Sequence, residues 1–163
     1  MPESMEYWLL KTEPDCFSIQ DLAKAPKRTT CWSGVRNYQA RNFMRDGMKL
    51  GHHVLLYHSS CNPPAVVGVA KVCREAYPDD TSWDPDNEHF DPQSSKDNPR
   101  WFMVDIQLDQ VFAEPIPLEQ LRKMPQLKQM ELLRRGSRLS VQPVRKAEFD
   151  AITRLAQRTT ASK

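Results

Sequence analysis

Four short segments combine polar, aromatic and basic residues in a way that suits the binding of a flat, polar ligand. They are Lys11-Thr12-Glu13, Trp32-Ser33-Gly34-Val35-Arg36-Asn37, Tyr57-His58-Ser59 and Arg138-Leu139-Ser140. Each lies at the end of an apolar strand or at the beginning of a helix in the predicted structure. A nucleobase pocket needs aromatic faces for stacking, polar groups for the base edge and basic groups for flanking phosphates. The pattern favours such a pocket, and the ordinary alternative is that Trp32 and Tyr57 are core residues.

The local cluster with the most reactive side chains is His58-Ser59-Ser60-Cys61. Nucleophilic catalysis needs a base within hydrogen-bond reach of the thiol, and proximity in sequence does not supply it. Adjacent His52 and His53 would point to opposite sides of a strand, which disfavours a shared metal ion. Because dinucleotide, P-loop and hydrolase motifs are also missing, we expect a binding protein without metal or cofactor. A hydrolase or nuclease that uses Cys/His or carboxylate groups stays open as an alternative.

The length of 163 residues fits one domain, and 39% apolar with 27% charged residues excludes wholesale disorder. The four cysteines are widely spaced and form no CxxC motif: Cys16, Cys31, Cys61 and Cys73. No apolar run approaches the ~18 residues of a membrane span. We therefore expect a reducing, cytoplasmic location and no membrane partner.

Charge is distributed in three blocks that the net charge of +2 conceals. Residues 1–74 hold ten Lys and Arg against six Asp and Glu, which gives +4. Residues 75–121 hold two against twelve, or −10, and residues 122–163 hold eleven against three, or +8. Two basic segments could converge on one face and attract a polyanion, although such blocks often only keep a surface solvated.

The elements that must position these residues are strands with short helices interspersed between them. The predicted strands are 7–11, 54–57, 66–72, 101–112 and 137–141. The predicted helices and helical turns are a segment that starts at Ser18 and stops before Pro26, then 37–46, 118–122, 127–135 and 145–158. An acidic segment, 75–99, reads as a long ordered loop anchored by Trp83 and Phe90. Without a regular βαβ rhythm, the pattern indicates a single α+β domain over 1–158 built on a small mixed β-barrel, followed by a short flexible tail over 159–163.

Six stretches of the chain together resemble the EVE domain family, a group within the PUA-like barrels. They are residues 7–14 (YWLLKTEP), 32–42 (WSGVRNYQARN), 56–59 (LYHS), 67–70 (VGVA), 99–101 (PRW) and 137–141 (SRLSV). They occur in family order over nearly the whole chain. The resemblance implies a PUA-like barrel flanked by short helices and related to YTH domains, which hold methylated adenine of RNA in an aromatic cage.

The resemblance also implies non-enzymatic recognition of a modified base in DNA or RNA, with modified cytosine in DNA as the leading candidate. Carried onto this chain, the pocket would be lined by Lys11, Thr12, Glu13, Trp32, Ser33, Gly34, Val35, Arg36, Asn37, Tyr57, His58, Ser59, Arg138 and Ser140. Within it, Trp32 would provide the stacking face. The base edge would meet Thr12, Glu13, Asn37 and Ser59, and the phosphates would meet Arg36, Arg41 and Arg138. A module that binds only a nucleoside or another small molecule is the remaining alternative.

Overall fold

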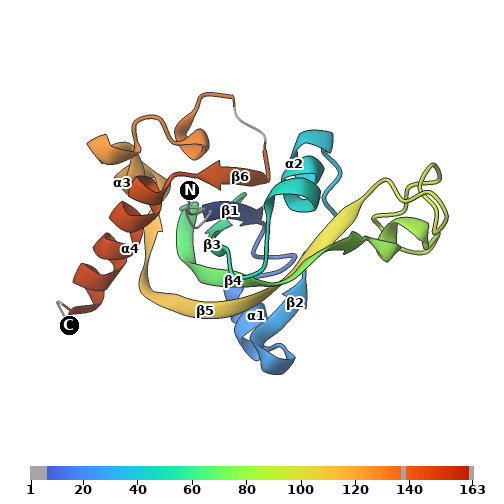
Figure 1. Ribbon diagram of the computed structural model, residues 1–163. Helices are drawn as coiled ribbons and strands as arrows, with labels where there is room; N and C mark the ends of the chain where they lie inside the picture. The colour runs from blue at the N-terminus through green and yellow to red at the C-terminus, as the bar shows by residue number, and fades with distance from the viewer. Residues whose placement is uncertain (1–6, 137–138, 162–163) are drawn as a thin grey trace.

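The computed structural model describes residues 7–136 and 139–161, with side chains described up to Gln157. Six strands form one mixed sheet in the order β2-β5-β4-β3-β1-β6. Their bounds are Tyr7–Thr12 (β1), Thr29–Cys31 (β2), His53–His58 (β3), Ala65–Pro78 (β4), Phe102–Pro117 (β5) and Val141–Val144 (β6). The long strands β4 and β5 bend around the shorter ones (Figure 1). The single α+β domain with a mixed sheet and short helices is therefore confirmed.

Strand β1 lies inside the sheet, parallel to β3 and antiparallel to β6. Successive side chains of a strand point to opposite faces, and both faces of β1 are buried. Trp8 and Leu10 pack into a core on one face, whereas Tyr7 and Leu9 pack into a core on the other. The sheet thus separates two hydrophobic cores, each covered by its own helices.

The first core is covered by α1 (Ile19–Lys24) and α2 (Tyr38–Asn42). Helix α2 continues as a wider π-helical turn over Phe43–Gly47, so that the helix predicted over 37–46 is confirmed. The turn ends at Gly47, where the Trp8 ring leaves no room for a side chain: a Cβ atom would lie 2.7 Å from Cη2 of Trp8.

The second core is covered by α3 (Leu118–Arg122) and α4 (Lys146–Ala161). Between them, two 3₁₀ turns at Pro125–Leu127 and Glu131–Leu133 replace the single helical turn predicted over 127–135. Helix α4 continues through Ala161, beyond the predicted end at 158. Among the described residues, no helix is long and apolar enough to cross a membrane.

Strands β4 and β5 are longer than predicted because they pair with each other over most of their length. Strand β5 contains Pro115 and ends at Pro117, so it runs past the predicted end at residue 112. Strand β2 reaches only Asp105 to Gln107 of β5, which leaves the proline end of β5 as a sheet edge. Proline, which lacks an N–H donor, is tolerated at such an edge.

The remaining differences concern short edge strands. Strand β2 was not predicted, because three residues carry no usable periodicity. The strand predicted over 137–141 instead occupies Val141–Val144 and contains Pro143, again at a sheet edge. The part of that prediction at residues 137 and 138 lies outside the described residues.

The acidic loop between β4 and β5 projects from one end of the molecule (Figure 1). Polar contacts hold it: the Asp79 N–H donates to the Trp101 carbonyl at 2.8 Å, and the Trp101 indole donates to Asp91 at 2.6 Å. Phe90 is 39% exposed, so the predicted aromatic anchor at this position is wrong. The loop also begins at Asp79 rather than at residue 75, because β4 runs to Pro78.

Candidate functional site

A cavity of about 570 Å³ lies where the end of β1, the segment between β2 and α2, and the acidic loop meet. Its predicted lining residues are Lys11, Thr12, Trp32, Ser33, Gly34, Val35, Arg36, Asn37 and Ser140. The others are Cys16, Phe17, Thr30, Cys31, Glu88 and His89. Binding cavities for small molecules typically measure ~300–1,000 Å³. The structure therefore brings three of the four sequence segments to one cavity large enough for a nucleobase.

The segment from Trp32 to Asn37 is held in place by the buried carboxylate of Asp79. This carboxylate accepts hydrogen bonds from the Gly34 N–H at 2.8 Å and from the Thr81 hydroxyl at 2.5 Å. It also forms an ion pair with Arg36 at 3.2 Å. Burial alone would raise the pKa of Asp79, but these hydrogen bonds and the Arg36 charge lower it. Asp79 thus stays ionised and fastens the segment to the acidic loop.

Arg36 belongs to the same network and is not available to a phosphate. A guanidinium group has five N–H donors. In Arg36 they meet the carbonyls of Val35 and His89, the Asp79 carboxylate and the Thr81 hydroxyl. The prediction that Arg36 contacts phosphate is therefore corrected: its cation joins the cavity wall to the acidic loop.

The acidic loop also contributes Glu88 and His89 to the cavity, and neither residue was among the predicted site residues. The His89 ring lies over Gly34, whose φ of +85° favours glycine. A Cβ atom at position 34 would lie 2.6 Å from Cε1 of His89. The loop shows no periodicity, so no sequence pattern could place His89 there.

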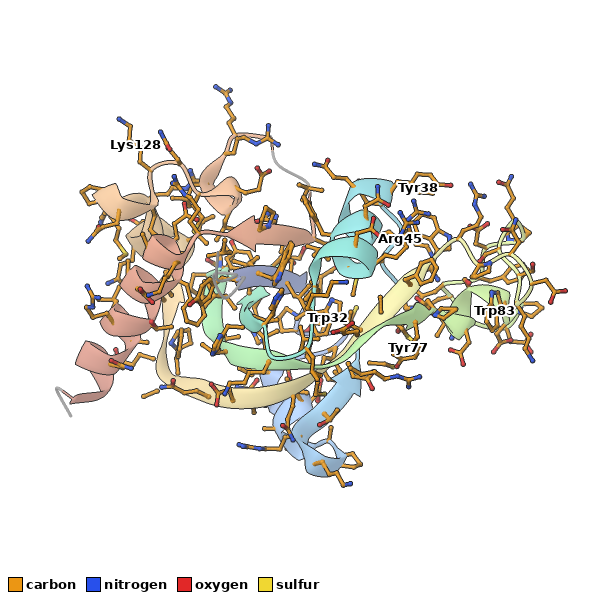
Figure 2. All side chains as sticks on the ribbon, in the orientation of Figure 1. Trp32, Tyr38, Arg45, Tyr77, Trp83 and Lys128 are labelled. Atoms are coloured by element: carbon orange, nitrogen blue, oxygen red, sulfur yellow. The ribbon has the colours of Figure 1, made fainter. Side chains whose placement is uncertain are left out.

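Trp32 is both a core residue and a wall of the cavity. It is 8% exposed and meets Phe17 edge-on, with ring centroids 6.1 Å apart. Figure 2 shows Trp32 near the middle of the molecule, beside the sheet. The two predicted alternatives for this residue are therefore compatible, because most of the ring packs in the core and a small part lines the cavity.

Polar groups surround this aromatic wall. The ammonium group of Lys11 is partly buried, and burial lowers its pKa despite the opposing effect of Glu131. The side-chain oxygen of Asn37 accepts from the Ala40 N–H at 2.9 Å and caps α2. The Thr12 hydroxyl donates to the Phe17 carbonyl at 2.8 Å. Among the described residues, neither the Lys11 ammonium nor the Asn37 side-chain nitrogen donates to a protein acceptor.

Four of the residues predicted to line the base pocket do not line the cavity. Tyr57 is buried in the core on the opposite face of the sheet. The His58 ring accepts a hydrogen bond from the Ile19 N–H at 3.1 Å and so holds the start of α1. The Ser59 N–H donates to the Thr12 carbonyl, and Glu13 lies in an exposed turn. Arg138 lies outside the described residues.

The positions of Cys61 and His58 do not support a catalytic Cys/His pair. Cys61 meets the backbone carbonyls of His58 and Pro63, at 3.6 and 3.5 Å, rather than the His58 ring. Inside the cavity, burial raises the pKa of Cys31, and Asp105 adds to the effect. Thiols with raised pKa values are poor nucleophiles. Within residues 7–136 and 139–161, no three His, Cys, Asp or Glu side chains gather in a metal-binding cluster.

Arg41, predicted to contact phosphate, lies outside the cavity and over the ring of Tyr38, 4.8 Å from its centroid. Figure 2 shows Tyr38 and Arg45 at the same end of the molecule, with Lys128 at the opposite end. Arg45 of the first basic segment and Lys128 of the last therefore do not share one patch. Charge among the described lining residues is nearly balanced, since Arg36 is paired with Asp79 and the lining holds one further cation, Lys11, and one carboxylate, Glu88.

This arrangement defines a class: a PUA-like mixed sheet with a cavity at the strand ends. The EVE domain matches residues 6–155, and the chain belongs to the EVE domain family. Human thymocyte nuclear protein 1 is 45% identical over 93% of this chain and 74% of its own length.

Solved structures agree with the family assignment. A hypothetical protein from Leishmania major superposes with a TM-score of 0.90 at 43% identity, over 96% of this chain and 98% of that chain. Human thymocyte nuclear protein 1 in complex with 5-methylcytosine-containing DNA superposes with a TM-score of 0.88 at 45% identity, over 93% of this chain and 97% of that chain. An ASCH protein from Zymomonas mobilis, at 14% identity and a TM-score of 0.53, shares the fold alone.

Proposed function

We propose that this protein binds DNA that carries 5-methylcytosine and holds the modified base in the cavity beside Trp32. The observation that carries the proposal is this cavity, in a chain that is 45% identical to a human protein whose structure contains 5-methylcytosine DNA. A base must leave the stack to enter such a cavity, so the substrate is a flipped or unpaired nucleotide.

The chemistry of the cavity suits methylated cytosine. The apolar walls at Phe17, Trp32 and Val35 offer a surface for the ring and its methyl group. The Lys11 ammonium can donate to the carbonyl edge of cytosine, and the Glu88 carboxylate can accept from its amino group. In this proposal, stacking and van der Waals contact recognise the methyl group, and polar contacts recognise the cytosine.

A binding titration with matched oligonucleotides tests the proposal. Fluorescence anisotropy is measured for single strands with one 5-methylcytosine or one cytosine at the same position, and for an RNA of the same sequence. We expect the methylated DNA strand to bind more tightly than both others. Equal affinity for methylated and unmodified DNA would contradict the proposal. A preference for the RNA strand would identify RNA, rather than DNA, as the partner.

Lys11→Met removes the donor and keeps most of the aliphatic stem. We expect it to weaken binding of the methylated strand about tenfold, as the loss of one charge-assisted hydrogen bond would. Lys24→Met changes an exposed lysine on α1 and is the matched control, with unchanged affinity expected. Equal affinities of the two variants for the methylated strand would show that Lys11 does not contact the base.

The free nucleoside separates this function from that of a small-molecule module. A protein that reads a strand binds 5-methyl-2′-deoxycytidine more weakly than the same base in a strand, because the flanking nucleotides are missing.

We further propose a reducing, cytoplasmic location, supported by four free cysteines.

A further inference from the structure

Tyr38 is an exposed aromatic residue that the base-binding cavity does not use. Tyr38 is the first residue of α2 and is 46% exposed. The ring stacks on Trp101, with centroids 4.9 Å apart and planes 18° from parallel. Because Trp101 is buried, it gives the Tyr38 ring a fixed support.

Two arginines flank the same ring. The guanidinium carbon of Arg41 lies 4.8 Å from the Tyr38 ring centroid, and that of Arg100 lies 5.5 Å from it. Arg41 donates to the Arg100 carbonyl at 2.8 Å, and Arg100 donates to the Tyr38 hydroxyl. Tyr38, Arg41 and Arg100, here called the arginine–tyrosine surface, are therefore held together before any ligand binds.

The charge of this surface is only partly compensated. The hydrogen-bond acceptors of Arg41 are uncharged, namely the Asn42 side-chain oxygen and the Arg100 carbonyl. Arg100 lies 3.9 Å from the Asp91 carboxylate, which also accepts from the Trp101 indole. Burial, and then the neighbouring charge of Arg45, lowers the pKa of Arg41. An anion between Arg41 and Arg100 would relieve the repulsion between like charges.

Arg45 is excluded from this surface, since Asp46 already pairs with its guanidinium group at 2.9 Å. This ion pair is useful as a comparison. It shows that the same helix carries one neutralised arginine and one, Arg41, whose charge is not balanced by a hydrogen-bonded carboxylate.

The arginine–tyrosine surface is directly connected to the cavity. Asn37 lines the cavity, and Tyr38 is the next residue. Arg36 on the cavity wall and Arg41 on the surface both lie over the Trp101 ring, at 5.3 and 6.0 Å from its centroid. A ligand that fills the cavity and continues outward past Asn37 therefore reaches Tyr38 next.

We propose that the arginine–tyrosine surface binds the nucleotide next to the base in the cavity, with its base stacked on Tyr38 and its phosphate held by Arg41 and Arg100. The inference rests on the proposed function, because it requires a strand whose modified base enters the cavity. A stacking aromatic beside cations suits a single-stranded nucleic acid, since every base offers a π-face. Recognition here is independent of the modification.

The test uses the full chain and two single strands, one with a single 5-methylcytosine and one without it. Anisotropy titrations at several salt concentrations compare wild type, Tyr38→Ala, Tyr38→Phe and Arg41→Gln. We expect Tyr38→Ala to weaken binding of both strands by roughly tenfold, as the loss of one stacked base does, and Tyr38→Phe to restore most of that loss. Arg41→Gln should weaken both strands equally and reduce the slope of log K against log salt by about 0.7.

Arg154→Gln, an exposed arginine on α4 and so on the opposite face of the sheet, is the matched control and should bind as wild type does. Wild-type affinity and salt slope in both Tyr38→Ala and Arg41→Gln would overturn the proposal. If wild type shows no preference for 5-methylcytosine while these variants still lose affinity, the proposed function fails, and the arginine–tyrosine surface binds single strands without a modified base in the cavity. If the preference is present and the variants lose nothing, the surface fails and the proposed function stands.

Discussion

Asp79 is a buried carboxylate that organises the cavity although it does not line it. It is fully buried and joins the Gly34 backbone, the Arg36 guanidinium and the Thr81 hydroxyl. Each partner belongs to the cavity wall or to the acidic loop. The shape of the cavity therefore depends on a residue that stands outside the cavity lining.

Asp79→Asn should lower the free energy of unfolding by about 2–4 kcal/mol, because a neutral amide cannot accept all these hydrogen bonds and leaves Arg36 without its counter-ion. Chemical denaturation measures the loss. Asp80→Asn, an exposed neighbour with the same chemical change, should cost much less. Equal losses in the two variants would contradict the role assigned to Asp79.

His58 makes the stability of the fold depend on pH. Its ring accepts from the Ile19 N–H, and burial lowers its pKa from the ordinary value of 6.5. Since the unfolded chain takes up the proton first, the stabilisation is fully present above about pH 6.5 and is lost as the pH falls through the lower pKa of the folded state. His53, whose pKa is also lowered by burial, changes stability in the same direction.

His58→Gln keeps an acceptor that does not titrate, so the variant should lose less stability than wild type between about pH 7 and pH 5. Thermal unfolding across this range measures the difference. Because every other titrating group is shared, the comparison isolates His58. Parallel pH profiles for the two proteins would show that the Ile19 hydrogen bond does not depend on the protonation of this ring.

At the scale of the elements, helix α1 begins with a reciprocal capping box. The Ser18 hydroxyl accepts from the Asp21 N–H at 3.1 Å, and the Asp21 carboxylate accepts from the Ser18 N–H at 2.9 Å. Ser18→Ala should lower the free energy of unfolding by about 1 kcal/mol, the usual effect of losing such a cap. Gln20→Ala, at an exposed position of the same helix, should change it little. If Ser18→Ala lowers the free energy of unfolding no more than Gln20→Ala does, the cap does not stabilise the fold.

The elements that sequence could predict are those fixed by neighbouring residues. Helices α1 and α2 carry their own signals, a capping box at Ser18 and an end at Gly47. The extended ends of β4 and β5 depend on the pairing of the two strands with each other, and no local sequence pattern predicts that pairing. Their extension past the expected limits is therefore a property of the sheet.

The candidate site was predictable in the same partial way. Residues Trp32 to Asn37 are recognisable in the sequence as a candidate binding segment. The sequence could not show that the N–H groups of Arg36 donate to Asp79 and to the His89 carbonyl. Tyr57 was placed in the pocket because it adjoins polar residues. Both faces of the sheet are buried, so alternation along β3 could not reveal that Tyr57 faces the core away from the cavity.

For the whole molecule, the near-neutral net charge of +2 results from regions that are separated in space as well as in sequence. The acidic loop projects from one end, beside the arginine–tyrosine surface, and Lys128 lies at the other end (Figures 1 and 2). We therefore expect a local footprint on nucleic acid: one base in the cavity and one nucleotide beside it.

The central claim is that the methylated base occupies the cavity at Trp32. Two-dimensional ¹H–¹⁵N NMR of the labelled protein, titrated with a strand containing one 5-methylcytosine, tests it directly. We expect the Trp32 indole and the Gly34 amide to shift strongly with the methylated strand and less with the unmodified strand. Trp8, whose indole donates to His52 within the protein, should stay in place. Equal shifts with both strands, or shifts confined to residues outside the cavity, would contradict the claim.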